Sequence, residues 1–165
     1  MCTFQQIVES EIIPDYLKEA ALFMASRTKR NMATIGGNIA ALRSDSYLLP
    51  TLFAVCARVE VLTPDGKQDD ICVNSYKEAS EAGKDMLITA VIVPDNVKVV
   101  SKRYSNTAQS HAVLTMSAAA LEKGFTLAGA IKNCGIYRFK GFEEMVRENP
   151  DISEEEAIAF FKGAD

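Results

Sequence analysis

A pair of adjacent glycines, Gly36 and Gly37, is the feature that most limits how the first part of this chain can fold. The pair lies in residues 27–40, where apolar residues show no helical period, so we predict a functional loop that leads into a short helix from about Asn38. Adjacent glycines allow positive φ and close backbone approach, and their N–H groups can form a concave anion site. With the start of a helix beside it and Arg30 nearby, this loop predicts a pyrophosphate receptor. The alternative interpretation is a tight turn between packed elements.

Helical patterns lie on both sides of this segment. Residues 3–9 are predicted to form a helix with Thr3 as its N-cap. A second helix is predicted over residues 15–25, because Pro14 suits a helix start and apolar residues follow at helical spacing. A further helix is expected after Pro50.

The middle of the chain has the pattern of a β-hairpin. Residues 59–63 alternate as a strand, residues 64–67 (Pro-Asp-Gly-Lys) are a strong turn signal, and residues 71–73 return as the second strand. Residues 74–84 are polar and are predicted to be a loop with a helical turn. Residues 86–93 are predicted to be a buried strand that stops at the following proline.

The last third of the chain predicts strands followed by helices. Residues 98–104 alternate as a strand, and residues 111–121 and 125–132 are predicted to be paired strands with a tight connection. Residues 141–148 and 153–162 are predicted helices, the second with a capping box at its start. Four aromatic side chains are expected to pack these helices together: Phe139, Phe142, Phe160 and Phe161.

These elements predict an α+β fold with two parts. Residues 1–94 form an α+β module with the glycine-containing loop, and residues 97–165 form a small antiparallel sheet followed by helices. A chain of 165 residues allows one large domain or two small ones, and its 48% apolar content is enough for a core.

Charge and composition exclude several functions. The net charge of −4 argues against nucleic-acid binding, and the absence of a long apolar run argues against a membrane span, so a cytoplasmic location is expected. The four cysteines form no C-x-x-C pair, so no metal site is expected, and Cys56 and Cys134 are interpreted as small buried thiols in a reducing compartment. With His111 as the one histidine, no catalytic triad is expected, and this residue is interpreted as a surface or packing residue.

Residues 30–39 carry a specific resemblance. Arg30-Asn31-Met32-Ala33-Thr34-Ile35-Gly36-Gly37-Asn38-Ile39 resembles the R-N-x-A-T-I-G-G-N-I signature of FAD-binding subunits in the molybdopterin dehydrogenase family, which includes xanthine dehydrogenase and carbon monoxide dehydrogenase. Residues 3–21 are similar to the family's T-T-x-x-x-I and I-P-x-L-x-x-A-A segments, and residues 48–54 to its D-L-L-P-x-L-x-A segment. Residues from about 97 onward resemble the family's C-terminal domain more weakly.

The resemblance implies that the first part of the chain is the second FAD-binding subdomain of a molybdenum hydroxylase flavoprotein. In that family FAD lies between two subdomains. Asp45 is taken as a contact because Tyr47 occupies the position of the family's acid, and no residue is expected to be catalytic. The expected FAD-binding residues are Ala33, Thr34, Gly36, Gly37, Asn38, Ile39, Asp45 and Lys102. The A-G-G-T-type loop of the first subdomain is not found, so the chain is expected to lack that subdomain and to bind FAD weakly or not at all by itself.

By this resemblance the chain is an FAD-binding electron-transfer component of a molybdenum-containing dehydrogenase, similar to xanthine dehydrogenase. It would pass electrons between iron–sulfur clusters and an acceptor, with a molybdopterin-binding large subunit and an iron–sulfur subunit as partners, and would be active only in the complete complex. Two alternatives stay open. One is a truncated assembly or interaction module that no longer binds FAD by itself, and the other is an unrelated small enzyme that binds a nucleotide at the glycine pair.

Overall fold

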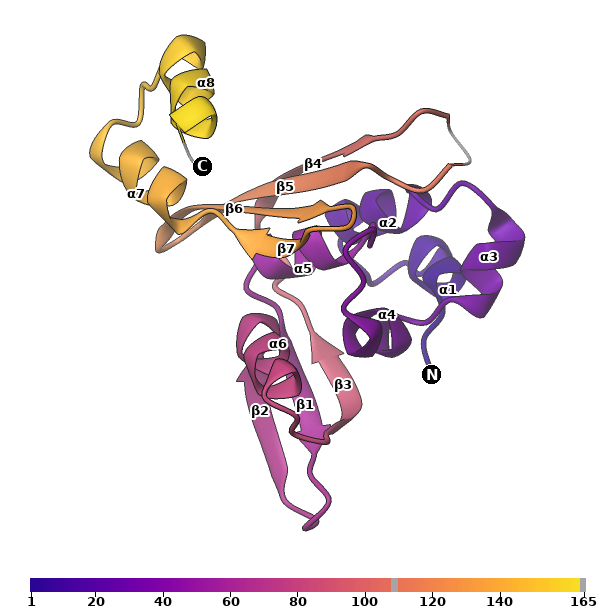
Figure 1. The fold of residues 1–165 in the computed structure, drawn as a ribbon. Helices are drawn as coiled ribbons and strands as arrows, with labels where there is room; N and C mark the ends of the chain where they lie inside the picture. The colour runs from indigo at the N-terminus through magenta and orange to yellow at the C-terminus, as the bar shows by residue number, and fades with distance from the viewer. Residues whose placement is uncertain (108–109, 164–165) are drawn as a thin grey trace.

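The computed structural model of the protein describes residues 1–107 and 110–163. Helices fill the first part of the chain, a three-stranded sheet follows, and a four-stranded sheet with two terminal helices completes the fold (Figure 1). This arrangement confirms the predicted α+β class. The division into residues 1–94 and 97–165 stays a prediction, and buried residues from both parts form one hydrophobic cluster. Within the described residues, no helix is both long and apolar enough to cross a membrane.

The first two helices are α1 (Phe4–Glu9) and α2 (Asp15–Leu22), which confirms both predictions. Thr3 caps α1 through a capping box, which satisfies backbone N–H groups that the helix itself leaves free. The second helix ends at Leu22 rather than at residue 25. Its last turn tightens there, because the N–H of Phe23 donates to the carbonyl of Ala20.

The loop predicted before Asn38 is wrong, because two short helices occupy residues 27–41, and the short helix predicted from about Asn38 is present but begins earlier, at Ile35. These are α3 (Arg27–Met32), capped by Ser26, and α4 (Ile35–Ala41), capped by Thr34. Each helix is too short for its apolar residues to show a period, and the hydroxyl caps carry the sequence signal instead.

The start of α4 is tied to the N-terminal segment of the chain. The N–H of Phe4 donates to the carbonyl of Ala33 (2.9 Å), and the N–H of Ile35 donates to the carbonyl of Cys2 (3.0 Å). These bonds form a short antiparallel bridge. As a result, the first turns of α1 and α4 hold each other in place.

The hairpin predicted in the middle of the chain is confirmed. It consists of β1 (Arg58–Leu62) and β2 (Gln68–Cys72), and β3 (Leu87–Ile92) pairs with the other side of β1. All pairs are antiparallel, in the order β2-β1-β3.

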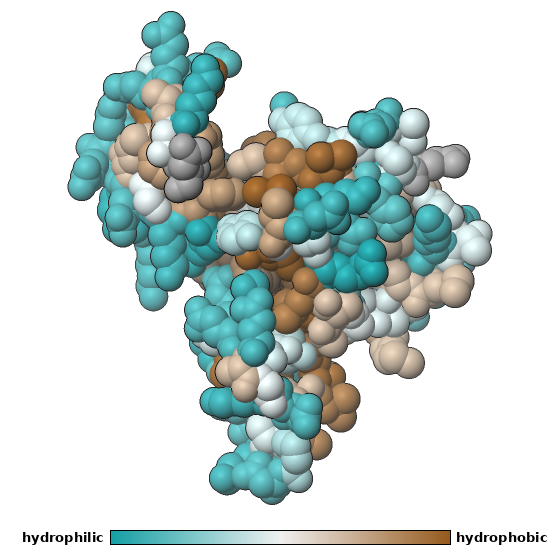
Figure 2. Space-filling model, viewed as in Figure 1, coloured by the Kyte–Doolittle hydropathy of each residue, from teal (hydrophilic) through white to brown (hydrophobic). Residues whose placement is uncertain are grey.

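Residues 86–93 contain the predicted strand, β3, but the prediction that this strand is buried is wrong. β3 pairs only with β1 and is an edge of its sheet, so Leu87 is 64% exposed and Ile92 is 43% exposed. Apolar surface lies over this strand at the lower right of Figure 2.

The prediction of a loop with a helical turn over residues 74–84 is wrong in the extent of the helix, because α6 (Val73–Glu81) covers most of these residues. The helix is held by the burial of Tyr76, which is 4% exposed. The helix ends at Glu81, with Ala82 as its C-cap. Gly83 follows with a φ of 76°, which suits a glycine, and the N–H of Lys84 donates back to the carbonyl of Ala79 in the last turn. The polar composition of this segment reflects the solvent-facing side of an amphipathic helix.

The C-terminal part confirms the predicted strands and helices. The four strands pair antiparallel in chain order, and the predicted strand over residues 111–121 begins at Leu114, so His111 lies in the connection before it. The elements are β4 (Lys98–Tyr104), β5 (Leu114–Leu121), β6 (Gly124–Ile131), β7 (Gly135–Arg138), α7 (Lys140–Glu148) and α8 (Glu154–Gly163).

The two terminal helices contact each other through aromatic rings, as predicted. Phe142 of α7 lies 5.4 Å from Phe160 and 5.1 Å from Phe161 of α8, measured between ring centroids. The capping box at the start of α8 is confirmed, because Ser153 and Glu156 exchange backbone and side-chain hydrogen bonds.

Helix α5 (Leu49–Ala54), expected after Pro50, joins the N-terminal part to the C-terminal sheet. Three hydroxyls meet at this contact: Thr51 lies 2.8 Å from Ser117 and 3.0 Å from Ser101, and the two serines are 2.8 Å apart. Every hydroxyl in this triangle therefore has a partner at a buried contact, as the packing of polar groups requires.

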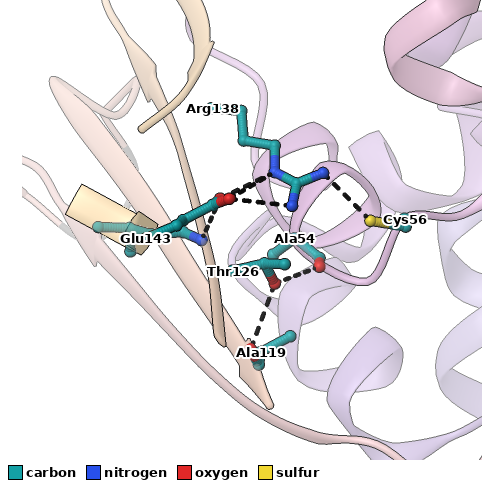
Figure 3. Close-up of polar contacts among 7 residues, drawn as sticks. Ala54, Cys56, Ala119, Thr126, Arg138 and Glu143 are labelled. Carbon is teal, nitrogen blue, oxygen red and sulfur yellow. Dashed lines mark hydrogen bonds and ion pairs between the residues drawn. The ribbon is translucent and has the colours of Figure 1, made fainter. Parts of the chain in front are cut away.

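A second group of polar contacts lies just beyond the end of α5, next to Cys56 (Figure 3). Glu143 is 4% exposed and accepts hydrogen bonds from Arg138 (2.8 Å) and from the backbone N–H of Leu127 (2.9 Å). The Glu143 carboxylate raises the pKa of Arg138. The guanidinium also lies 3.4 Å from the sulfur of Cys56, and burial raises the pKa of that thiol.

The interpretation of Cys56 and Cys134 as buried thiols is wrong for Cys134, which is exposed, whereas Cys56 is partly buried. Cys134 lies in the short turn between β6 and β7, where the apolar residues beside it belong to the strands and the turn itself faces solvent. All four cysteines are free thiols.

Candidate functional site

The glycine pair lies in the first turn of α4. The predicted positive-φ nest is wrong, because both residues have helical backbone conformation. The hydroxyl of Thr34 accepts from the N–H of Gly37 (3.1 Å), and the carbonyl of Thr34 accepts from the N–H of Asn38 (2.9 Å). Among residues 1–107 and 110–163, the N–H of Gly36 has no hydrogen-bond partner. The segment thus offers a donor at a helix start rather than in a nest.

The two glycines differ in what surrounds them. A Cβ added at Gly36 would meet nothing within 4 Å, whereas one at Gly37 would lie 2.8 Å from the Thr34 hydroxyl. Gly37 is therefore required for the cap, and Gly36 leaves the backbone open to a ligand.

Two cavities meet at this segment, and both Thr34 and Gly37 line each of them. The first, of about 520 Å³, lies between the segment and β3 and is lined mainly by apolar side chains, among them Leu17, Ile88 and Val91. The second, of about 370 Å³, lies on the other side. Both volumes fall within the range of small-molecule pockets. An elongated ligand could occupy both sides while its centre contacts the glycine pair.

The second cavity has a polar wall. The residues that line it include Asn38, Arg43, Asp45, Ser46, Tyr47 and His111. The hydroxyl of Ser46 donates to Oδ1 of Asn38 (2.9 Å), which leaves the Asn38 amide nitrogen as a hydrogen-bond donor.

Asp45 has two partners at this wall. Arg43 contacts both carboxylate oxygens, at 2.9 Å and 3.0 Å, and Nδ1 of His111 lies 2.9 Å from Oδ2. The hydrogen bonds from Arg43 lower the pKa of Asp45, and the charge of His111 acts in the same direction. Asp45 is therefore an ionised carboxylate that already has partners.

The structure brings most of the predicted site residues together. The second cavity is lined by Ala33, Thr34, Gly37, Asn38 and Asp45, and Gly36 lines the first cavity.

Two predicted site residues lie elsewhere. Ile39 lies in the hydrophobic core with no exposed surface, and Lys102 is exposed on β4 and lines neither cavity. Contact of these residues with FAD stays a prediction.

Arg30 does not lie at the site as predicted. It is 9% exposed, and its guanidinium donates to the side chain of Gln5 (2.8 Å) and to the carbonyls of Met24 (2.7 Å) and Ala25 (3.0 Å). These bonds use its planar fork to hold α1 against the turn before α3. The arginine of the motif is structural in this chain.

Sequence reasoning missed His111 as a residue of the cavity. It lies far from Asp45 along the chain, and only the folding of the β4–β5 connection onto the segment before α5 brings them together. It likewise missed the first cavity wall, because β3 was interpreted as buried.

A sequence profile described as the FAD binding domain in molybdopterin dehydrogenase matches residues 1–96, more than half of the chain. The chain belongs to this family. FAD is the cofactor of the family, which agrees with the resemblance carried by residues 30–39.

One curated relative is the uncharacterized protein YgfM of Escherichia coli K12. It is 31% identical over 121 residues, which make up 73% of this chain and 44% of YgfM. The chain therefore spans less than half the length of this relative.

Solved structures agree on the fold. A chain of the carbon monoxide dehydrogenase from Hydrogenophaga pseudoflava that lacks the Mo-pyranopterin moiety superposes with a TM-score of 0.69 at 19% identity, covering 84% of this chain and 53% of that one. A chain of quinoline 2-oxidoreductase from Pseudomonas putida 86 gives a TM-score of 0.70 at 13% identity, covering 82% and 52%. At these identities the likeness establishes the fold alone.

The residues at the glycine pair fit the diphosphate of FAD. They supply the free N–H of Gly36, the amide donor of Asn38 and open space above Gly36. Donors of this kind suit phosphate oxygens. The cavities on either side provide room for larger groups.

Proposed function

We propose that this chain forms part of the FAD-binding electron-transfer component of a molybdenum-containing dehydrogenase, similar to xanthine dehydrogenase. The observation that carries the proposal is the position of the glycine pair, which is open at Gly36 and lies where two cavities meet. Bound FAD would supply the redox chemistry, so the residues of the chain need only hold and orient it.

Seven of the eight predicted FAD-binding residues have a specific role in this scheme. The N–H of Gly36 and the Asn38 amide hold the diphosphate, and Thr34 and Gly37 keep the first turn of α4 in shape. Ile39 supports that turn from the core, and Asp45 orders the polar wall. In this scheme residues 1–94 are the FAD-binding part, and Lys102 reaches the cofactor from residues 97–165.

The proposal extends to partners and location. A molybdopterin-binding subunit and an iron–sulfur subunit would complete the electron path, in which the flavin passes electrons between the clusters and an acceptor. A cytoplasmic location agrees with four free thiols.

This chain is expected to bind FAD weakly by itself. The two cavities are open to solvent, so a ligand at the glycine pair would be only partly buried by the described residues. Contacts worth about 4 kcal/mol, if supplied by protein outside residues 1–165, change the dissociation constant about a thousandfold.

Flavin binding tests the proposal directly. FAD is titrated into the purified chain and into the chain copurified with molybdopterin and iron–sulfur subunits, and absorbance and fluorescence are recorded. Stoichiometric flavin in the complex supports the proposal. The blocking variant is Gly36→Trp, because a Cβ at this position meets nothing within 4 Å and the ring would fill the open space, and circular dichroism checks its fold.

The alternative is a non-catalytic assembly or interaction module that does not bind FAD by itself. It is favoured by the polar wall, where Asp45 is already paired with Arg43 and His111 and the Tyr47 ring lies under Arg103 at 5.2 Å. Copurification of the chain with both partner subunits, without any flavin spectrum, would replace the first proposal with this one.

A further inference from the structure

The Asp45–His111 pair is placed where it can act on a ligand rather than only on the fold. Asp45 belongs to the segment between α4 and α5, and His111 belongs to the connection between β4 and β5. Both line the second cavity together with Thr34, Gly37 and Asn38. The histidine side chain is 58% exposed, whereas that of Asp45 is 12% exposed.

The pairing decides what the imidazole can offer. Nδ1 faces Oδ2 of Asp45 at 2.9 Å and therefore carries its proton there. In the neutral ring, Nε2 is then an acceptor with a lone pair. In the charged ring, Nε2 becomes a donor. Within the described residues, Nε2 has no hydrogen-bond partner.

We infer that His111, in its protonated form and oriented by Asp45, donates from Nε2 to a phosphate oxygen of the dinucleotide held at the glycine pair. This inference rests on the proposed function. It adds a residue whose contact is controlled by pH, whereas the donors at Gly36 and Asn38 keep the same character at every pH near neutrality.

The charge balance of the wall favours an anion. The positive charge of Arg43 is balanced by the negative charge of Asp45, because Nε of Arg43 lies 2.9 Å from Oδ1 of Asp45. Protonation of His111 leaves the wall with one net positive charge. From the β4–β5 side, the nearby charge is Arg103, whose guanidinium lies over the Tyr47 ring and bonds to the carbonyl of Ser110. No carboxylate other than Asp45 lines this cavity among the described residues.

The sign of the pH dependence follows by linkage. If a phosphate binds the charged imidazole better than the neutral one, the ligand raises the midpoint of the imidazole titration and binding tightens as pH falls. A rise of about half a pH unit corresponds to about threefold tighter binding on the acid side.

NMR tests this with one resonance, because His111 is the one histidine of the chain. The ring signals of the full chain are titrated between about pH 5.5 and about pH 8, the range in which imidazoles change charge. The titration is done alone, with millimolar ADP-ribose, and with riboflavin. ADP-ribose carries a diphosphate diester of constant charge over this range, and riboflavin carries no phosphate. We expect ADP-ribose to raise the midpoint by about half a unit or more, and riboflavin to leave it unchanged.

Two variants complete the experiment, with ADP-ribose affinity measured by calorimetry across the same range. His111→Gln replaces the imidazole by an amide, which can donate a hydrogen bond but carries no titrating charge, so the affinity of this variant should lose the acid enhancement of about threefold. The matched control is Lys123→Gln, which changes a surface residue in the turn between β5 and β6. That turn lies at the far end of β5, roughly 23 Å from the strand end near His111. The control should keep the pH dependence of the parent chain.

Each outcome decides the inference. It is overturned if ADP-ribose binds without moving the His111 midpoint, if riboflavin moves it equally, or if millimolar ADP-ribose neither binds nor perturbs the ring. None of these results removes flavin from a copurified complex, so failure of the inference and failure of the proposed function are separate observations.

Discussion

Replacing each glycine of the pair by alanine gives two variants with different expected stabilities. Both glycines have helical backbone conformation, so alanine should stabilise either position by about 0.5–1 kcal/mol through the lower entropy of the unfolded chain. At Gly36 nothing lies within 4 Å of the new methyl group, so Gly36→Ala should show this gain.

At Gly37 the new methyl group would lie 2.8 Å from the Thr34 hydroxyl, which is too close. The hydroxyl must move away, and loss of an N-cap costs about 1 kcal/mol. This cost cancels or exceeds the gain from alanine. We therefore expect Gly37→Ala to be less stable than Gly36→Ala by about 1 kcal/mol.

Urea unfolding followed by circular dichroism measures both variants, with unchanged slopes as a check on the two-state analysis. A second pair in a Thr34→Ala background isolates the cause, because without the hydroxyl Gly37→Ala should stabilise as Gly36→Ala does. Equal stability of the two single variants, or a penalty at Gly37 that persists in the Thr34→Ala background, would refute the reasoning.

Three further predictions concern other polar contacts. Arg138→Met leaves the carboxylate of Glu143, which is 4% exposed, without its ion partner and should lower the free energy of unfolding in urea by about 3–5 kcal/mol. Adding Glu143→Gln should recover part of this loss, and purely additive effects in the double variant would contradict the pairing. Asp45→Asn should flatten the acid side of the curve of unfolding free energy against pH. The lowered pKa of Asp45 gives stability that is present above about pH 4 and is lost as pH falls through the folded-state value. An unchanged loss of stability at acid pH in the variant would contradict this role of Asp45. Ser117→Ala removes one hydroxyl from the contact with Thr51 (2.8 Å) and should cost about 1–2 kcal/mol, and a cost below about 0.5 kcal/mol would mean that the triangle adds no stability.

The sequence by itself predicted the elements whose signals are local. Thr3 and Ser153 mark helix starts through side chains that bond only three residues away. The hairpin of β1 and β2 follows from alternation on both sides of a Pro-Asp-Gly-Lys turn. The motif of residues 30–39 also indicated the family, because a run of this length is specific without any knowledge of its conformation.

Tertiary structure decided the features that depend on neighbours far along the chain. The apolar residues of β3 predicted burial, but burial is a property of the whole sheet, and the strand proved to be an edge. The sequence placed Arg30 near the phosphate site. In the structure its guanidinium donates to Gln5 and to two backbone carbonyls, so it is a buried structural residue.

The site shows the same division. The sequence named Thr34, Gly37 and Asn38 from the motif, and these residues line one cavity because a single helical turn carries all of them. No sequence pattern joined Asp45 to His111, because their contact depends on how the β4–β5 connection folds over the segment before α5. Short-range hydrogen bonds and periodicity depend on neighbouring residues, so the sequence alone predicts them. Burial, the edge strands of a sheet and contacts between residues far apart in the chain arise only after the elements have packed together.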